Sequence, residues 1–183
     1  MPQVLRRETF RTSRLLDFCS ERELVKQIGH GVDEWPLVIL KELVDNALDA
    51  CEEAVIAPVV TVTVDGGTIT ITDNGPGIPA ETIDGALDFT VRTSSREAYV
   101  SPTRGAQGNA LKTIVAMAFA LDGATGETII ESHGEAHTIT FTVDHIRNEP
   151  KIDHARSGSN VKTGTRITVK WPVWCETAER LRT

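Results

Sequence analysis

The 183 residues of the chain suffice for one domain with a substantial core and are too few for two ordinary domains. Hydrophobic residues make up 40% and charged residues 25%, which is typical of a soluble globular protein, and no apolar run approaches the roughly 20 residues that cross a bilayer, so no membrane partner is expected. The net charge of −7 argues against a domain that itself grips nucleic-acid phosphates, so any contact with DNA is expected to be indirect.

Three widely spaced cysteines, Cys19, Cys51 and Cys175, fit neither a disulfide framework nor the ligand spacing of a zinc site. A reducing compartment is therefore the default, and we expect a cytoplasmic protein.

The first part of the chain is predicted to be helical. A helix over residues 20–28 is expected to end at Gly29, and a second helix over about 33–55 begins near Pro36, since proline is tolerated in the first helical turn.

The second predicted helix carries a polar stripe formed by Glu42, Asp45, Asn46 and Asp49. Their spacing of i, i+3, i+4 and i+7 places all four on one side of the helix. A solvated face of an amphipathic helix explains the pattern equally well. Like charges at this spacing destabilise a helix, however, so a cation bound against the stripe is an attractive alternative.

A β-hairpin is predicted next, with strands over 59–64 and 68–72, and a loop over residues 73–79 follows it. In this loop Asp73 precedes Gly75 and Gly77, and glycine permits a close approach of the backbone to a ligand. The carboxylate of Asp73 could accept a hydrogen bond from the exocyclic amine of adenine. A plain surface turn is the competing interpretation, because Asp, Asn and Gly favour turns.

A short helix over 81–88 and a long mobile loop over 90–108 are expected to precede an apolar helix over 109–121. The segment from Arg104 to Lys112 joins this loop to the helix, and the free N–H groups of a helix N-terminus attract anions. A flexible loop before a core helix would look the same.

The remaining chain predicts strands over 127–132, 137–143 and 165–169, with a loose polar excursion over 147–164. The complete order predicts an α/β (α+β) two-layer sandwich whose mostly antiparallel, mixed sheet is covered by helices on one face. We expect the histidines to be surface or structural residues, since they share no spacing. They are His30, His133, His137, His145 and His154.

Together these segments resemble the GHKL, or Bergerat-fold, ATPase superfamily of gyrases, heat-shock chaperones and histidine kinases. Residues 42–49, 73–77 and 104–112 are similar to its first three motifs, and Gly164-Thr165 is similar to its fourth. The resemblance covers residues 36–170. The amino-acid sequences of the first and third motifs are most similar to those of the B subunit of topoisomerase VI.

The resemblance implies that the chain binds ATP with Mg²⁺. It makes Glu42 the general base for the attacking water, Asn46 the magnesium ligand and Asp73 the adenine-selecting group, assisted by Thr165. The further nucleotide-binding residues that it implies are Asp49, Gly75, Gly77, Ile78, Ser95, Arg96, Gly105, Ala106, Gln107, Gly108, Asn109, Ala110, Leu111 and Lys112.

The resemblance also suggests how the chain is organised. Residues 1–183 are expected to form a single ATP-binding domain without a transducer domain, in which 1–34 form an N-terminal strap and helix, 36–170 the nucleotide-binding core and 88–108 the ATP lid. Relatives form nucleotide-dependent dimers, so a slow ATPase that dimerises is expected. The only tyrosine, Tyr99, lies in the expected lid, so DNA cleavage would fall to a partner that resembles the A subunit of a topoisomerase.

Two other functions remain open at this point. The same site could serve an ATP-gated clamp or chaperone-like switch unrelated to DNA strand passage, because fold and site do not fix function. A nucleotide-binding interaction module without turnover is the other alternative, although a decayed site would be expected to have lost Glu42, Asn46, Asp73 or Gly77.

Overall fold

The computed structural model describes residues 18, 20–65, 67–87, 100–101, 105–106, 110–122, 126–144 and 149–170. Its helices and strands are α2 (Glu21–Ile28), the short 3-10 helix η1 (Val32–Glu34), α3 (Trp35–Glu53), β1 (Val60–Asp65), β2 (Thr68–Asp73), α4 (Ala80–Ala86), β3 (Val100–Ser101), β4 (Gly105–Ala106), α5 (Ala110–Asp122), β5 (Gly126–Ser132), β6 (Glu135–Asp144), β7 (Glu149–Gly158) and β8 (Thr165–Lys170). None of these helices is long and apolar enough to cross a membrane.

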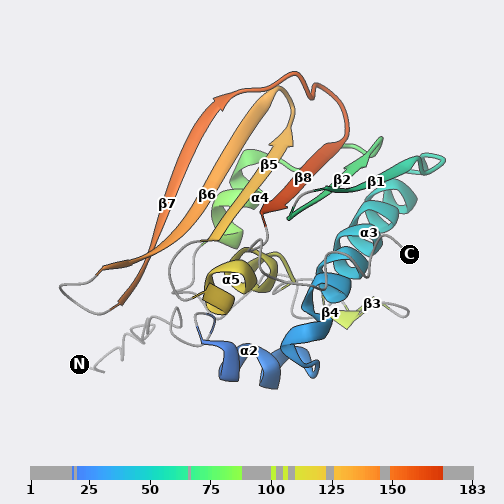
Figure 1. Cartoon of the computed structure of the whole chain (residues 1–183). Coiled ribbons are helices and arrows are strands. Elements are labelled where there is room, and N and C mark those ends of the chain that lie inside the picture. Colours follow the sequence, from blue (N-terminus) through green and yellow to red (C-terminus); the bar gives the residue numbers. More distant parts are fainter. Residues whose placement is uncertain are drawn as a thin grey trace, which may run out of the picture.

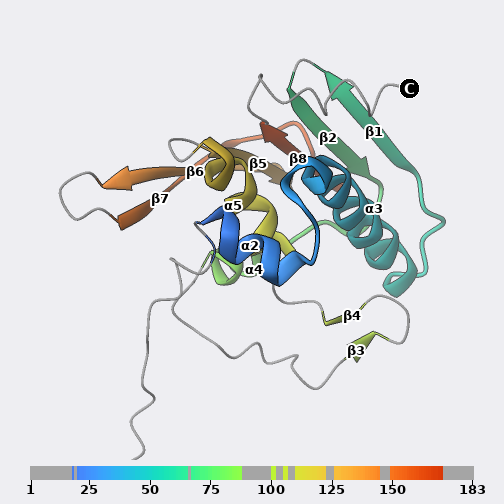
Figure 2. The same cartoon turned by 60° about the horizontal axis from the view of Figure 1, so that its bottom comes forward.

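The main sheet has six strands in the order β1-β2-β8-β5-β6-β7, and every described neighbouring pair is antiparallel. Figures 1 and 2 show helices α2 to α5 gathered on one face of this sheet. The predicted two-layer sandwich with helices on one face is therefore confirmed.

Buried apolar and outward-facing polar side chains alternate along the strands, and this alternation explains why helices cover only one face of the sheet. In β2 the threonines point away from the helices, whereas Ile69 and Ile71 are buried beneath them. Apolar side chains of β5, β6 and β8 continue this inner face and pack against α5, where the rings of Phe119 and Phe141 lie 5.9 Å apart, whereas α3 packs against β2. Burying one face of each element holds the two layers together.

Helix α2 begins and ends as the sequence predicts. The Ser20 hydroxyl accepts a hydrogen bond from the backbone N–H of Glu23 at 3.3 Å, and Gly29 adopts a left-handed φ of 77° at the C-terminal end. Helix α3 ends at Glu53, slightly before the predicted end, because Val55 has already left the helix with a φ of 56°.

Two predicted loops contain strands. Residues 149–158, expected to be a loose excursion, form β7, which pairs along its whole length with β6 at the edge of the sheet. An edge strand has one half-exposed face, so it tolerates the polar residues that made this segment look irregular. Within the expected loop 90–108, β3 pairs with β4 as a separate two-stranded sheet, and the rest of that segment lies outside the described residues.

The outer face of the sheet is polar and carries a bidentate ion pair. Arg166 of β8 donates from Nε and Nη2 to the Glu131 carboxylate of β5 at 2.5 and 2.6 Å, and the Ser159 hydroxyl donates to the same carboxylate at 2.8 Å. Hydrogen bonds from Arg166, and then from Ser159, hold the pKa of Glu131 below its ordinary value despite partial burial.

We predict that Glu131→Gln lowers the free energy of unfolding by about 2 kcal/mol at neutral pH, since it removes charge-assisted hydrogen bonds. The pKa of Glu131 is lowered by folding, so its contribution is complete above the unfolded pKa of about 4.3 and is lost as the pH falls through the folded value. Urea denaturation of both proteins at pH 7 and pH 4 should show a smaller difference at pH 4.

Glu127→Gln is the matched control. Glu127 also lies on β5, but its partner is the half-exposed ammonium of Lys170 rather than a guanidinium that binds both carboxylate oxygens. An equal loss in both variants at pH 7 would contradict the special role of the Glu131–Arg166 pair.

Candidate nucleotide-binding site

The candidate site forms where the ends of three neighbouring interior strands, β2, β8 and β5, lie side by side. Strand β8 lies between β2 and β5, and the register pairs Thr72 with Arg166 and Ser132 with Thr165. This register brings Asp73 at the end of β2 beside Thr165 at the start of β8, although the two residues are 92 positions apart in the sequence.

The Asp73 carboxylate is fixed by backbone donors. Its Oδ1 accepts hydrogen bonds from the N–H groups of Gly75 at 2.8 Å and Thr165 at 3.2 Å. Among the described residues both contacts reach Oδ1, so Oδ2 keeps its lone pairs for a donor on a ligand. The arrangement suits recognition of an amino group such as that of adenine.

Gly164 permits the close approach of β8 to Asp73. Its φ is +71°, and a Cβ atom there would lie 2.0 Å from the carbonyl oxygen of Asp73. Any side chain at this position would push the two strands apart, and the left-handed backbone adds strain for every residue but glycine. Gly164 is thus a structural requirement of the contact between Asp73 and Thr165.

The loop after Asp73 is tied down on both sides. The side chain of Asn74 accepts from the N–H of Val59 at 2.8 Å and donates to the carbonyl of Ala57 at 3.0 Å, both in the connection between α3 and β1. Farther along, the N–H of Ile78 donates to the Ser132 hydroxyl at 2.8 Å. These bonds leave the loop little freedom before a ligand arrives.

Gly75 and Gly77 meet different neighbours. Gly75 is buried, and a Cβ atom there would lie 3.0 Å from Asp73 Oδ1 and 3.4 Å from the sulfur of Cys51 on α3. Gly77 has a φ of +88°, and a Cβ atom would lie 2.6 Å from the Ser132 hydroxyl. Both glycines let the loop lie directly on the surrounding elements.

Cys51 is a buried free thiol beneath this loop. Burial, and then the negative charge of Asp73, raise the pKa of the Cys51 thiol above its ordinary value. The thiol therefore stays neutral, and it donates to the side-chain oxygen of Asn74, with 3.5 Å between the sulfur and Oδ1.

The polar stripe of α3 adjoins the loop, because Ala50 and Cys51 at its C-terminal end contact the position of Gly75 and Asn46 lies one turn before Ala50. Asn46 and Asp49 are half-buried. The side chain of Glu42 is 38% exposed.

A cation does lie against part of this stripe, and it belongs to the same helix. The ammonium of Lys41 lies 2.7 Å from the Asp45 carboxylate and 3.6 Å from that of Glu42. The hydrogen bond with Asp45 raises the pKa of Lys41. Asp45 is thereby engaged on the helix surface, whereas Glu42, at 3.6 Å, is held only loosely.

The structure describes the predicted phosphate segment in part. Gly105 and Ala106 form β4, and Ala110, Leu111 and Lys112 begin α5. Predicted site residues that lie outside the described part are Ser95, Arg96, Gln107, Gly108 and Asn109. The structure thus brings together Asp73, Gly75, Gly77, Ile78 and Thr165 beside the stripe of α3, and leaves the lid residues as predictions.

Two residues that fix the loop were not singled out by the sequence, namely Asn74 and Ser132. Asn74 stood within the glycine loop, but nothing in the sequence indicated that it would bind the backbone before β1. Ser132 carried no signal, since only the strand register brings it to the loop.

Comparison with known proteins gives a family match over most of the chain. Residues 31–174 match the family described as histidine kinase-, DNA gyrase B- and HSP90-like ATPase. Among curated relatives, the chain is 36% identical over 156 residues to the B subunit of type 2 DNA topoisomerase 6 from Natronomonas pharaonis, covering 79% of this chain and 19% of that protein. The protein of the same name from Archaeoglobus fulgidus is 33% identical, with 73% of this chain and 23% of that protein covered.

The chain therefore spans about a fifth of the length of these relatives. Among solved structures, the 43K ATPase domain of Thermus thermophilus gyrase B in complex with an aminocoumarin is similar with a TM-score of 0.42 and 22% identity, covering 86% of this chain and 40% of that one.

We predict that Gly164→Ala lowers the free energy of unfolding by at least about 2 kcal/mol, from backbone strain and the clash with Asp73. Thermal or urea denaturation measures this loss. Gly158→Ala in β7 is the control, because a Cβ atom there meets nothing within 4 Å. Equal stability of the Gly164 and Gly158 variants would contradict the role assigned to this close approach.

Proposed function

The chain belongs to the family of histidine kinase-, DNA gyrase B- and HSP90-like ATPases, and from this premise we propose that it binds ATP with Mg²⁺ and hydrolyses it slowly. The observation that carries the proposal is the Asp73 carboxylate, held by two backbone N–H groups at a fixed glycine loop.

The adenine would bind at Asp73. Because Oδ1 is engaged by Gly75 and Thr165, Oδ2 is the atom that would accept the exocyclic amine. The loop 73–79 is already tied to β5 and to the connection before β1, so little conformational entropy remains to be lost on binding.

The metal and the reaction would involve α3. Mg²⁺ prefers oxygen ligands and takes few of them from the protein, and the amide oxygen of Asn46 is such a ligand, half-buried one turn from the loop. When bound with ATP, the ion would neutralise charge on the phosphate oxygens. Glu42 is accessible enough to orient a water molecule and accept its proton as general base, and Asp49 would support the polar stripe.

The phosphates would lie toward the start of α5, where backbone N–H groups and the helix dipole favour anions. Residues 105–112 would supply these donors together with the charge of Lys112. Ser95 and Arg96 complete the proposed contacts from the expected lid at 88–108.

We further propose that the chain acts as the ATP-binding domain of a protein similar to the B subunit of topoisomerase 6, the name carried by its curated relatives. Nucleotide-dependent dimerisation through residues 1–20, a DNA-cleaving partner similar to the A subunit of a topoisomerase and a cytoplasmic location belong to this proposal. The net charge of −7 supports only an indirect contact with DNA.

We predict that Asp73→Ala weakens binding of a non-hydrolysable ATP analogue by about 30-fold or more, because a charge-assisted hydrogen bond of roughly 2 kcal/mol is lost. Isothermal titration calorimetry with and without Mg²⁺ measures the effect, and Mg²⁺ should strengthen binding to the wild type. Asp153→Ala, an exposed aspartate on β7, is the control and should bind as the wild type does. Nucleotide binding that survives Asp73→Ala unchanged would exclude the adenine site proposed here.

We predict that Glu42→Gln lowers the ATPase rate by about 100-fold or more while analogue binding stays within a few-fold of the wild type, because only proton transfer is lost. Asp45→Asn on the same helix is the control and should retain most activity, since its carboxylate pairs with Lys41 at the surface. A steady-state phosphate-release assay reports the rates. Equal losses in both variants would assign the effect to the helix rather than to a general base.

A further inference from the structure

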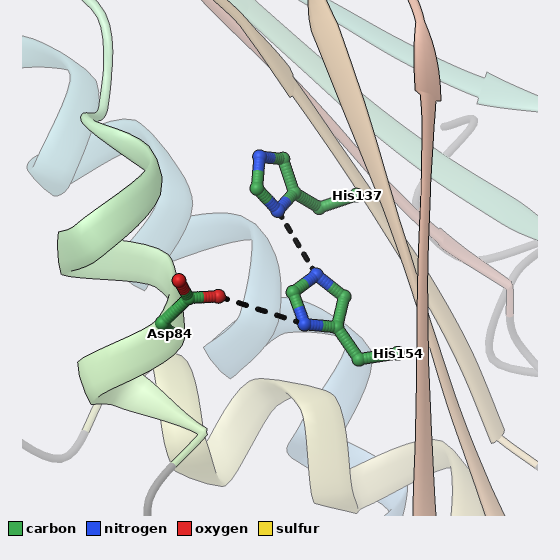
Figure 3. Close-up of side chains that lie close together, drawn as sticks. All are labelled: Asp84, His137 and His154. Carbon is green, nitrogen blue, oxygen red and sulfur yellow. Dashed lines mark hydrogen bonds and ion pairs between the residues drawn. The ribbon is translucent and has the colours of Figure 1, made fainter.

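Three side chains distant in the sequence meet between α4 and the neighbouring strands β6 and β7, as Figure 3 shows. They are Asp84 of α4, His137 of β6 and His154 of β7. One ligand atom from each, a nitrogen of either imidazole or a carboxylate oxygen, lies within 4.8 Å of the others.

The strand register creates this cluster. His137 pairs with Arg156 and Ile139 pairs with His154, so the two imidazoles are diagonal neighbours on adjacent strands. They share the inner face of the sheet with the core residue Ile139, and α4 covers them with Asp84. Three separate elements therefore hold the three groups.

Burial closes the cluster on one side and leaves it open on the other. The side chain of His137 is 2% exposed, that of His154 is 20% exposed, and that of Asp84 is 45% exposed. A small ion could enter from the Asp84 side and meet imidazole nitrogens that are already screened from bulk water.

The cluster is incompletely satisfied by its own hydrogen bonds. His137 Nδ1 and His154 Nε2 lie 2.9 Å apart, so one ring must donate and the other accept. The outer contacts are longer than good hydrogen bonds, at 3.6 Å from His154 Nδ1 to Asp84 and 3.5 Å from His137 Nε2 to Glu135. Two carboxylates thus lie near two converging imidazoles without saturating them.

We propose that Asp84, His137 and His154 form a binding site for a divalent transition metal, with Zn²⁺ as its first candidate. Two imidazole nitrogens and one carboxylate oxygen are a common protein ligand set for Zn²⁺, and a water molecule on the exposed side would complete a tetrahedron. Mg²⁺ and Ca²⁺ prefer oxygen ligands, so this site differs in chemistry from the magnesium site proposed at Asn46.

Arg156 tunes the site. Its guanidinium nitrogen Nη2 lies 2.7 and 2.5 Å from the two oxygens of Asp84, and Nη1 lies 3.8 Å from Glu135. A carboxylate has lone pairs enough to bind a metal through one oxygen and keep Arg156 on the other. The fixed positive charge nevertheless opposes a bound cation, so removing it should tighten metal binding.

Metal binding would fasten α4 to the edge of the sheet. Helix α4 begins at Ala80, directly after the loop 73–79, and in the described structure Asp84 reaches β7 through Arg156 and His154. A metal held by α4, β6 and β7 would stabilise the folded chain against unfolding, since the site does not exist in the unfolded chain. This inference does not depend on ATP binding.

The test is a calorimetric titration of ZnCl₂ into the untagged, nucleotide-free full chain in the presence of millimolar Mg²⁺. We expect one Zn²⁺ per chain, at least 10-fold weaker binding in Asp84→Asn and His154→Asn, and tighter binding in Arg156→Gln. His30→Asn is the matched control, because His30 is an exposed histidine with a carboxylate partner, Glu34, outside the cluster. Circular dichroism of each variant verifies that it is folded, and the buried His137 is left unchanged.

Absorption of the Co²⁺-substituted protein supplies a second readout, since tetrahedral coordination gives intense visible bands that surface adsorption lacks. These bands should vanish in His154→Asn and persist in His30→Asn. Zinc binding by the wild type that is absent at micromolar concentration, or that is equal in the wild type and both cluster variants, would overturn the proposal. Loss in His154→Asn alone would exclude Asp84 as a ligand and overturn the three-residue site.

Discussion

The insertion of β8 between β2 and β5 is the constraint on which the candidate site depends. It places Thr165 between Asp73 and Ser132, so that the N–H of Thr165 joins the N–H of Gly75 in binding one oxygen of the Asp73 carboxylate. Gly164 makes the insertion possible, because any Cβ atom there would lie 2.0 Å from the Asp73 carbonyl oxygen. The strand order of the sheet and the position of the Asp73 carboxylate therefore both depend on the close approach of Gly164 to the Asp73 backbone.

Much of the fold could be predicted because local patterns and tertiary packing agree. The alternation of threonine and isoleucine in β2 fixes its buried face, and Ser20 and Gly29 delimit α2 through their capping preferences. The edge strand β7 escaped prediction for the opposite reason. Its stability comes from pairing with β6, whereas its polar side chains carry little periodic signal of their own.

The residues of the candidate sites also differ in whether the local sequence predicts them. Asp73, Gly75 and Gly77 are contiguous, so their spacing alone indicates a glycine loop that follows a strand. Other residues are brought together only by the strand register and the position of α4, which no local sequence pattern encodes. They are Ser132, Asp84, His137 and His154. The histidines looked unrelated in the sequence because 16 positions lie between His137 and His154 (137 to 154), and the strands fold back between them.

Hydrogen bonds restrain both ends of the loop 73–79, so a ligand would meet a loop whose conformation is already fixed. Asn74 anchors its beginning to the connection between α3 and β1, Ile78 bonds to Ser132, and α4 continues from it to the Asp84–Arg156 contact at β7. A base held at Asp73 would meet groups already in place, so selectivity would come from the fixed direction of one carboxylate oxygen. The restraint at the far end passes through α4, since this short helix follows the loop directly and carries Asp84, whose partners Arg156 and His154 lie on β7.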